Sequence, residues 1–354
     1  MNNPNNLITT IIPTYNRSSI LKKTIRNVLS QNNSSNIIIS DNASTDNTPE
    51  VVKKFSQLYK DRFCYFKNLS NLGIYNNFNS GLKRVKSKYF NIMSDDDFLA
   101  PGFINECIQI LENNSDINVV VFDTIVINKN YKVVADRHPK YFEGIMNAGQ
   151  SVEKFVNNEI PRTWTGMMFR SNVLINSGYI DNDIGPYADG YWLYKVFLNN
   201  KIFLKNKIGA ILVNHDKNFS NSIKTFDLNS IDHHKIFKER LYSKLSPSNK
   251  LIMDQTLDLM LPNFFSLAKI QIMNLHYEKN IKDINNLIYF FYKNNFKHHY
   301  LEIKKIDSII KKFPIIIYII KILKIINRSK NFIITFFITF KFKKLISDIK
   351  NTYE

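Results

Sequence analysis

Four consecutive residues, Ser94-Asp95-Asp96-Asp97, carry the side chains in this chain that are most suited to chemistry. They follow a short apolar run and precede residues 98–102, where we expect a turn that opens a helix. Adjacent carboxylates raise one another's pKa unless a cation lies between them. Mg²⁺ and Mn²⁺ prefer such oxygen ligands and often share them with substrate phosphates. The cluster therefore predicts a metal–diphosphate site; the alternative is an acidic loop that caps the next helix.

The elements around this cluster alternate between strands and helices. Short apolar, β-branched runs predict buried strands at 7–12, 36–40, 63–67 and 89–93. The segments between these runs have helical spacing, so the alternation predicts an α/β fold with a mostly parallel sheet. Ligands of such sheets bind beyond the carboxyl ends of the strands. Three polar loops fall there, at 13–17, 41–48 and 94–97.

The rest of the chain divides into a further stretch of this fold and a helical, basic region. We expect a helix from about 101 to 113, strands near 119–126, 163–170 and 208–213, and an irregular polar stretch at 128–162. From about residue 226 the pattern is helical. We therefore expect an α/β domain at 1–225 and a helical, basic C-terminal region at 226–354.

The composition restricts the class of partner. The chain has 354 residues and a formal net charge of +18, which favours a nucleic acid, a membrane surface or a phosphorylated substrate. Nucleic acid is not expected, because no recognised binding motif accompanies the scattered charge. Cys64 and Cys107 have neither metal-ligand spacing nor a disulfide pattern, as expected of a reducing compartment. The first residues lack the pattern of a secretory signal, so we expect none.

Four motifs taken together resemble a known family. They are the loop 13–17, the cap-rich segment 41–48, the run Asn71-Leu72-Gly73, and the acidic cluster 94–97 with Pro101. In order and spacing they are similar to nucleotide-sugar glycosyltransferases of the GT-A fold, family 2, over roughly residues 7–220. The resemblance implies a Rossmann-like, mostly parallel sheet flanked by helices.

The resemblance also implies roles for the residues that bind the donor. Asp41 would contact the nucleotide base, which is uracil in a UDP-sugar, and Asp95 the ribose; a plain turn-forming role for Asp41 is the alternative. Asp96 would bind the Mn²⁺ or Mg²⁺ ion that bridges the diphosphate. The remaining donor-binding residues would be Pro13, Tyr15, Arg17, Asn71 and Gly73, with Ser94 and Asp97 in support. His215 lies where some members contact the metal or the diphosphate, although a lone histidine is often structural.

The resemblance places the catalytic base about ninety residues after the acidic cluster. Asp189 occupies that position, while Ala188 departs from the acidic pair that is common there. Asp181 and Asp183 are nearby alternatives, each also readable as an ordinary loop carboxylate. An inverting transfer needs one carboxylate to take the proton of the acceptor hydroxyl. Acceptor sugars could stack on the rings of Trp164 and Trp192. For Trp192, a position in the hydrophobic core is the alternative.

The C-terminal region contains two apolar runs interrupted or followed by lysines. The runs are at 315–326 and 331–340, and neither reaches the ~20 apolar residues of a spanning helix. Such segments suit a helix lying in the interface of an anionic membrane. The alternatives are packing on the α/β domain or on a second subunit of a homo-oligomer.

These observations lead to one main functional expectation. We expect a metal-dependent, inverting glycosyltransferase that moves a sugar from a nucleoside-diphosphate donor to a glycan or lipid-linked glycan in bacterial surface polysaccharide synthesis, such as lipopolysaccharide or capsule. It would lie in the cytoplasm, peripheral on the inner face of the membrane. A nucleotidyltransferase is the first alternative, against which the absence of glycine from 13–17 counts. The second is a catalytically degenerate, membrane-tethered module that binds a sugar nucleotide.

Overall fold

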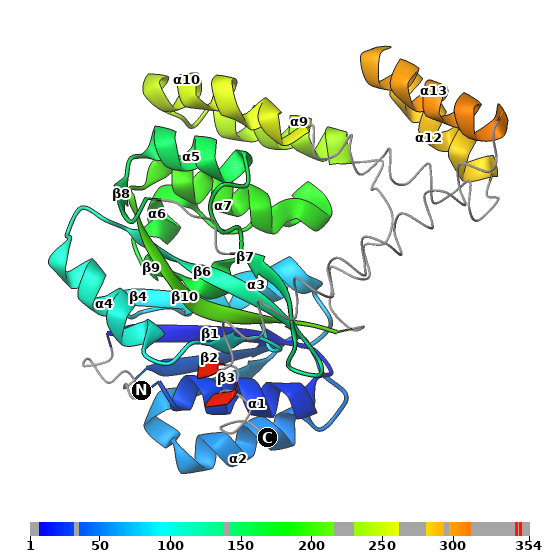
Figure 1. Cartoon of the computed structure of the whole chain (residues 1–354). Coiled ribbons are helices and arrows are strands. Elements are labelled where there is room, and N and C mark those ends of the chain that lie inside the picture. The colour runs from blue at the N-terminus through cyan, green and yellow to red at the C-terminus, as the bar shows by residue number, and fades with distance from the viewer. Residues whose placement is uncertain are drawn as a thin grey trace.

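Ten strands form one central sheet in the computed structural model (Figure 1). The structure describes residues 7–31, 35–137, 142–215, 230–261, 281–293, 297–312, 344–345 and 347–348. The strands are β1 (Ile8–Thr14), β2 (Asn36–Asp41), β3 (Phe63–Lys67), β4 (Tyr89–Ile92), β5 (Phe98–Leu99), β6 (Val119–Asn128), β7 (Val133–Arg137), β8 (Gly144–Met146), β9 (Met167–Arg170) and β10 (Ile202–Asn214). Their order in the sheet is β3-β2-β1-β4-β9-β6-β10-β5, with β7 paired to β6 and β8 to β10.

The sheet is mixed, and six of its strands run in the same direction, namely β1, β2, β3, β4, β6 and β10. The strands β3, β2, β1 and β4 are parallel neighbours, as are β6 and β10. The short strands β5, β7, β8 and β9 all pair antiparallel to their neighbours. Two expectations are corrected here. Residues 98–99 form a strand rather than a turn, and the stretch 128–162 contains β7, β8 and a helix, because nonlocal pairing with β6 and β10 orders it.

Helices cover both faces of the sheet. They are α1 (Ser18–Leu29), α2 (Thr48–Leu58), α3 (Ile74–Leu82), α4 (Phe103–Asn113), α5 (Ala148–Val156), α6 (Val173–Ser177), α7 (Ala188–Asn199), α9 (Ser230–Tyr242), α10 (Pro247–Thr256), α12 (Ile281–Lys293) and α13 (Lys297–Lys312). The 3₁₀ turns are η1 (Lys60–Arg62), η2 (Trp164–Gly166), η3 (Asn182–Tyr187) and η4 (Leu257–Met260). One core contains α1, α2 and α4, and the other contains α3, α5 and α7.

The first C-terminal helices belong to the second of these cores. Phe237 of α9 packs on the ring of Tyr191 in α7, with 4.5 Å between the ring centroids. Met253 of α10 and Leu257 of η4 are fully buried in the same cluster. The hydrophobic core therefore continues past the boundary expected at residue 225, and the division into two regions stays a prediction.

Farther along the chain, α12 and α13 pack on each other (Figure 1). Within the described segments, no helix is both long and apolar enough to cross a bilayer. The apolar runs at 315–326 and 331–340 lie outside the described residues.

A glycine in β10, Gly209, allows this strand to lie close to Phe122 of β6 and Phe103 of α4. A Cβ atom at Gly209 would lie 2.4 Å from the Phe122 Cβ and 2.7 Å from the Phe103 Cδ2. We expect Gly209→Ala to lower the free energy of unfolding by about 1–3 kcal/mol, because overpacking forces the backbone apart. Gly149→Ala is the control, since its Cβ would meet Ile252 at an ordinary 3.6 Å. Urea unfolding measures both, and equal stability of the two variants would contradict the prediction.

Candidate active site

The acidic cluster follows β4 and is held by β1 and by the loop after it. The Thr14 hydroxyl donates to Asp95 Oδ2 at 2.7 Å, and Arg17 Nη1 donates to Asp95 Oδ1 at 2.8 Å. The Thr24 hydroxyl of α1 donates to the Asp95 carbonyl at 2.7 Å. Strand β1 lies beside β4 in the sheet, so these contacts join residues about seventy to eighty positions apart. Asp95 is thereby fixed at the carboxyl edge of the sheet.

Asp96 lies between a cation and an imidazole. Arg17 Nη1 is 2.7 Å from Asp96 Oδ2, and the same oxygen lies 3.1 Å from His215 Nε2. The Asp96 carboxylate is only 6% exposed. His215 arrives there because it follows β10, which runs parallel to β6 toward the same edge. The structure thus brings together the two residues that the sequence assigned to the metal.

The Asp97 carboxylate is held by η2 and β10 rather than by β1. The carboxylate accepts from the Thr165 hydroxyl at 3.0 Å and from the Val213 N–H at 3.1 Å. Burial raises the pKa of Asp97 well above its ordinary value, and the charge of Asp96 raises it further. These bonds connect the cluster to η2 and β10, which agrees with a supporting role. The supporting roles of Ser94 and Asp97 remain predictions.

The cluster carries more negative charge than its protein neighbours balance. Burial, and then the charge of Asp96, raise the pKa of Asp95 to about 6, although Arg17 and Thr14 oppose the shift. Burial lowers the pKa of Arg17, but the charges of Asp95 and Asp96 outweigh it and the net shift is upward. Three buried carboxylates beside one guanidinium favour binding of a further cation.

The ligand set suits a divalent ion that also binds a substrate. A carboxylate and an imidazole, from Asp96 and His215, are ligand types of Mn²⁺, and Mg²⁺ accepts the oxygens. Across the described segments, no cluster of three or more His, Cys, Asp or Glu side chains is arranged to hold a metal ion. Mg²⁺ commonly takes one or two carboxylates together with phosphate oxygens. The residues therefore fit an ion whose coordination is completed by a diphosphate.

Asp41 ends β2 beside this cluster and is completely buried. Its carboxylate accepts from the Ser44 N–H at 2.8 Å and from the Tyr65 hydroxyl at 2.7 Å. The loop at 41–48 is joined to the loop at 13–17 by Asn16, whose side-chain oxygen accepts from the Thr45 N–H at 2.7 Å. Asn16 has a φ of +53°, a region that asparagine tolerates better than most residues. Asp41 is therefore a fixed acceptor at the base of both loops.

The third predicted loop lies against the second. The Asn42 amide donates to the Asn71 side-chain oxygen at 2.7 Å, and the Gly73 N–H donates to that oxygen at 2.9 Å. Gly73 has a φ of +81°, which glycine adopts without strain, and it immediately precedes α3. The predicted donor residues Asn71 and Gly73 thus adjoin the Asp41 loop. Tyr15 lies in the first loop with 43% of its surface exposed, so its ring is accessible.

Pro13 is placed differently from the prediction. It lies inside β1, in register with Ser40 of β2, and is buried. Its ring therefore offers little exposed surface to a nucleotide, the exposed part of the loop begins after Thr14, and the donor-binding role of Pro13 stays a prediction. Proline is acceptable there because β1 pairs with β2 alone at this position, since its ladder with β4 ends at Ile11 and Ile92.

We expect Tyr65→Phe to destabilise the protein and weaken nucleotide binding. The change removes the hydroxyl that donates to the buried Asp41 carboxylate, and hydrogen bonds to charged groups contribute about 1.5–3 kcal/mol. Urea unfolding gives the stability, and the rise in Tm on adding UDP with Mn²⁺ gives the binding. Tyr242→Phe, on a ring that is 40% exposed, is the control. Equal behaviour of the two variants would argue against a structural hold on Asp41.

Asp189 lies in the first turn of α7 and is partly buried. Its Oδ1 accepts from the Gly190 N–H at 2.8 Å. Burial raises the pKa of Asp189, and the hydrogen bond from Gly190 opposes the rise. The preceding turn is anchored by the Tyr75 hydroxyl, which donates to the Pro186 carbonyl at 2.6 Å. Because Tyr75 is the second residue of α3, directly after the Gly73 loop, Asp189 lies at the same edge as the donor loops.

The two alternative bases are engaged elsewhere. Asp181 pairs with Lys195 at 2.8 Å, and Asp183 pairs with Arg240 at 2.8 Å. For Asp183, the pair with Arg240 lowers the pKa. Asp189 therefore remains the best candidate base among these three residues.

The two tryptophans belong to the core. Trp192 is fully buried, and its indole N–H donates to the Gly178 carbonyl at 2.9 Å. Its predicted contact with an acceptor is wrong, because neither ring face is accessible. Trp164 packs on Phe78 with 4.6 Å between the ring centroids and is 8% exposed. Only a small part of this ring could meet a ligand, and its acceptor role stays a prediction.

Several residues that build the site were missed. Thr24 and Asn27 lie on the buried face of α1, where Thr24 holds the Asp95 carbonyl and Asn27 exchanges two hydrogen bonds with the backbone of Leu99. Polar residues within an apolar helical stripe are a signal that could have identified them. Thr165 gave no such signal, because its contact with Asp97 arises only from the tertiary fold.

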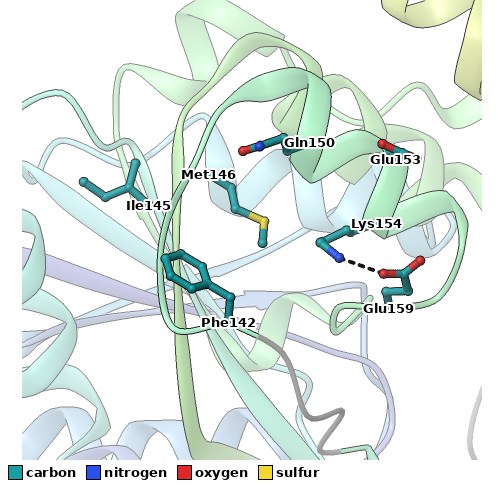
Figure 2. A pocket seen from close by; sticks show the side chains of 7 residues that line it. All are labelled: Phe142, Ile145, Met146, Gln150, Glu153, Lys154 and Glu159. Carbon is teal, nitrogen blue, oxygen red and sulfur yellow. Dashed lines mark hydrogen bonds and ion pairs between the residues drawn. The ribbon is translucent and has the colours of Figure 1, made fainter.

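A separate pocket lies far from this edge. It has a volume of about 510 Å³, and Figure 2 shows Phe142, Met146 and the ion pair Lys154–Glu159 around it. It lies beside β8, which pairs with the first residues of β10, whereas His215 follows the last. None of the predicted site residues lines it. The candidate active site is therefore the acidic edge.

Comparison with known proteins agrees with this geometry. Residues 9–178 match the family model described as glycosyl transferase family 2. A Campylobacter jejuni protein, GalNAc(5)-diNAcBac-PP-undecaprenol beta-1,3-glucosyltransferase, is 34% identical over 104 residues, which are 29% of this chain and 33% of that protein. The chain spans about a third of the length of the curated relatives it matches.

Two solved structures have a similar fold. The structure of S. aureus TarS 1-349 in complex with UDP-GlcNAc superposes with a TM-score of 0.64 and 17% identity, covering 80% of each chain. The Pyrobaculum calidifontis mannosyltransferase PcManGT, in complex with GDP-Man and Mn²⁺, superposes with a TM-score of 0.51 and 13% identity, covering 87% of each chain. At these identities the likeness concerns the fold alone. Residues 9–178, just under half of the chain, therefore match glycosyl transferase family 2, and the α/β sheet has the GT-A fold.

Proposed function

We propose that this protein is a metal-dependent, inverting glycosyltransferase. Its donor is a nucleoside-diphosphate sugar, with UDP-sugars favoured, and its acceptor is a hydroxyl of a glycan or lipid-linked glycan in bacterial surface polysaccharide synthesis. The observation that supports the proposal most is the meeting of Asp95, Asp96 and His215 at the edge that also carries Asp41. Oxygen and imidazole ligands beside a nucleotide-sized set of polar loops suit a metal-bound diphosphate.

In this proposal the donor lies across the three loops. Asp41, with its carboxylate fixed by Ser44 and Tyr65, is the contact for the base, and the exposed ring of Tyr15 is available for stacking. Asp95 contacts the ribose. The carboxylate of Asp96 and the imidazole of His215 would hold Mn²⁺ or Mg²⁺, which would supply Lewis-acid stabilisation of the leaving diphosphate.

Asp189 takes the proton of the acceptor in the reaction. The acceptor oxygen forms a bond to the anomeric carbon as its proton passes to the Asp189 carboxylate. The bond from that carbon to the diphosphate breaks, and the electron pair leaves with the nucleoside diphosphate. Burial raises the pKa of Asp189 toward the working pH, which improves a general base. Attack from the face opposite the leaving group inverts the configuration of the sugar.

The acceptor brings the protein to a membrane surface in this proposal. The related C. jejuni protein is named for an acceptor carried on PP-undecaprenol. On α13 the side chains of Leu301 and Ile309 are 63% and 39% exposed, beside the exposed Lys304 and Lys305. Lysines next to exposed apolar residues suit peripheral binding to the anionic cytoplasmic leaflet. Cosedimentation with phosphatidylglycerol vesicles, and not with phosphatidylcholine vesicles, is the expected result.

The donor proposal is tested by binding. The protein is mixed with UDP, GDP, UDP-GlcNAc or GDP-mannose in Mn²⁺ or in EDTA, and the Tm is recorded. We expect UDP and a UDP-sugar to raise the Tm in Mn²⁺ but not in EDTA, since a ligand that binds only the folded state stabilises it. Asp96→Asn should remove the Mn²⁺-dependent part, while Asp116→Asn, at an exposed pair with Lys201, should not. If none of the nucleotides raised the Tm, the proposal would be overturned.

A further inference from the structure

A helix that follows the matched family segment packs against the turn that precedes Asp189. Residues 184–189, called the base loop below, span the end of η3 and the start of α7. Helix α9 packs against η3, and Figure 1 shows α9 lying over α7. The family match ends at residue 178 and α9 begins at Ser230, so this contact is not part of the matched segment.

The first contact between them depends on a glycine. Gly185 has a φ of +77°, and a Cβ there would lie 2.4 Å from His233 Cε1 and 2.5 Å from His233 Nδ1. The imidazole of α9 therefore lies directly on the backbone of the base loop, four residues before Asp189. A side chain larger than hydrogen would force the His233 ring or one of the two elements to move, and the positive φ would strain it.

The second contact is a chain of hydrogen bonds that begins at a buried tyrosine and ends at an exposed aspartate. The Tyr191 hydroxyl, two residues after Asp189, lies 3.0 Å from His234 Nδ1, and His234 Nε2 lies 3.2 Å from Asp258 Oδ1. Tyr191 and His234 are 1% and 2% exposed. Burial lowers the pKa of His234, and Asp258 opposes the shift. In the neutral tautomer, Nε2–H donates to Asp258 and Nδ1 accepts from Tyr191, so each polar atom is satisfied.

We propose that α9 positions the catalytic base. His233, against Gly185, and the chain Tyr191–His234–Asp258 fix the base loop, so that Asp189 points into the acceptor site. Tyr191 and His234 are positioning residues, because they act on the reaction through the placement of Asp189. The inference rests on the proposed function of Asp189. It gives the helical region after residue 226 an indirect part in the transfer reaction, through the position of Asp189.

The chain offers a matched pair of variants for the test. Tyr191→Phe removes the hydroxyl that bonds His234. Tyr194→Phe removes a comparable buried hydroxyl of the same helix, which lies 3.0 Å from the Thr256 Oγ1 but is five residues from Asp189. Each variant loses one buried hydrogen bond to the C-terminal helices, so their costs in stability should be similar. They differ in whether the lost bond lies next to the base.

We expect Tyr191→Phe to lower kcat by about 10- to 100-fold, because a displacement of a reacting group by about 1 Å can cost this much. Tyr194→Phe should stay within twofold of the wild-type kcat, and KM for the UDP-sugar should be unchanged in both. Amide hydrogen exchange should become faster in residues 184–190 of Tyr191→Phe alone. The acid limb of its kcat profile should also move to lower pH, because a displaced Asp189 is less desolvated.

A second pair tests the glycine contact. Gly185→Ala should reproduce the loss of kcat, and Gly149→Ala in α5 should not, since its Cβ has ordinary contacts. Equal losses in Tyr191→Phe and Tyr194→Phe, or wild-type kcat in Tyr191→Phe and Gly185→Ala, would overturn the inference. The variant Asp189→Asn distinguishes failure of this inference about α9 from failure of the proposed role of Asp189 as the base. If that variant keeps the wild-type kcat, Asp189 is not the base, whereas the exchange measurement still shows whether α9 holds the loop.

Discussion

Asp189→Asn is expected to lower kcat for sugar transfer by at least about 10²-fold, the lower end of what a general base contributes. The amide cannot accept the proton of the acceptor hydroxyl, while its size is the same and its Oδ1 can still accept from the Gly190 N–H. The Tm rise with UDP and Mn²⁺ should match that of the wild type. Transfer is measured by the release of UDP from the UDP-sugar that binds in the Tm screen, with an acceptor glycan present.

The pH profile of the wild type carries a second expectation. Asp189 must be ionised to act as a base, and burial raises its pKa above the ordinary aspartate value of about 3.9. Because the pKa is raised, kcat should fall as the pH decreases through a value above this one, and should be full at higher pH. The remaining activity of Asp189→Asn should not show this fall in kcat at low pH.

Asp183→Asn is the control for this experiment. Asp183 lies six residues earlier and pairs with Arg240 at the surface, where its side chain is 66% exposed. Exposed ion pairs contribute roughly 0–1 kcal/mol, so neither stability nor kcat should change measurably. Loss of kcat in Asp183→Asn with retention in Asp189→Asn would exchange the two assignments.

Arg17→Met is expected to lower the free energy of unfolding of the metal-free protein by about 3–5 kcal/mol, the range for breaking a buried ion pair. Arg17 Nη1 lies within 2.8 Å of both Asp95 and Asp96, which are 8% and 6% exposed. Its removal leaves the carboxylates of Asp95 and Asp96 beside that of Asp97, with no guanidinium between them. Urea unfolding in EDTA measures the loss.

Added Mn²⁺ should reverse much of this loss. A divalent cation bound by Asp96 and His215 would neutralise the same carboxylates, so the Mn²⁺-induced rise in Tm should be larger in Arg17→Met than in the wild type. This result would also show that the guanidinium and the ion compete for one position. A Mn²⁺ response identical to that of the wild type would speak against a shared position.

Lys88→Met is the matched control, because it breaks an ion pair of the same length at the surface. Lys88 Nζ lies 2.8 Å from Glu112, and the two side chains are 47% and 42% exposed. The expected cost in stability is small, since water screens exposed pairs. If both variants lost equal stability, burial of the acidic cluster would not be the cause.

The site could be predicted from sequence where its residues are local to a strand end. The runs at 36–40, 63–67 and 89–93 became β2, β3 and β4 within one or two residues, and the loops after β1, β2 and β4 meet at one edge. Parallel strands place their carboxyl ends together, so local patterns were sufficient here. Asp41 and Asp96 were found in this way.

Other features depend on partners that are distant in sequence. The strand at Phe98–Leu99 exists because β10 pairs with it, and the helix at Ala148–Val156 packs against α7. The burial of Pro13 and Trp192 likewise follows from neighbours that no local pattern indicates. Helix α9 was expected to be an appendage, yet it packs beside the base loop.

Local patterns in the amino-acid sequence were enough to predict the α/β alternation, the three polar loops and the acidic residues at the strand ends, because strand and turn preferences act over a few residues. The fold was needed to show that His215 lies 3.1 Å from Asp96, that Arg17 bridges two carboxylates, and that His233 lies against Gly185. These contacts join residues between 48 and 119 positions apart. Packing and burial select such pairs, and both depend on the whole fold at once.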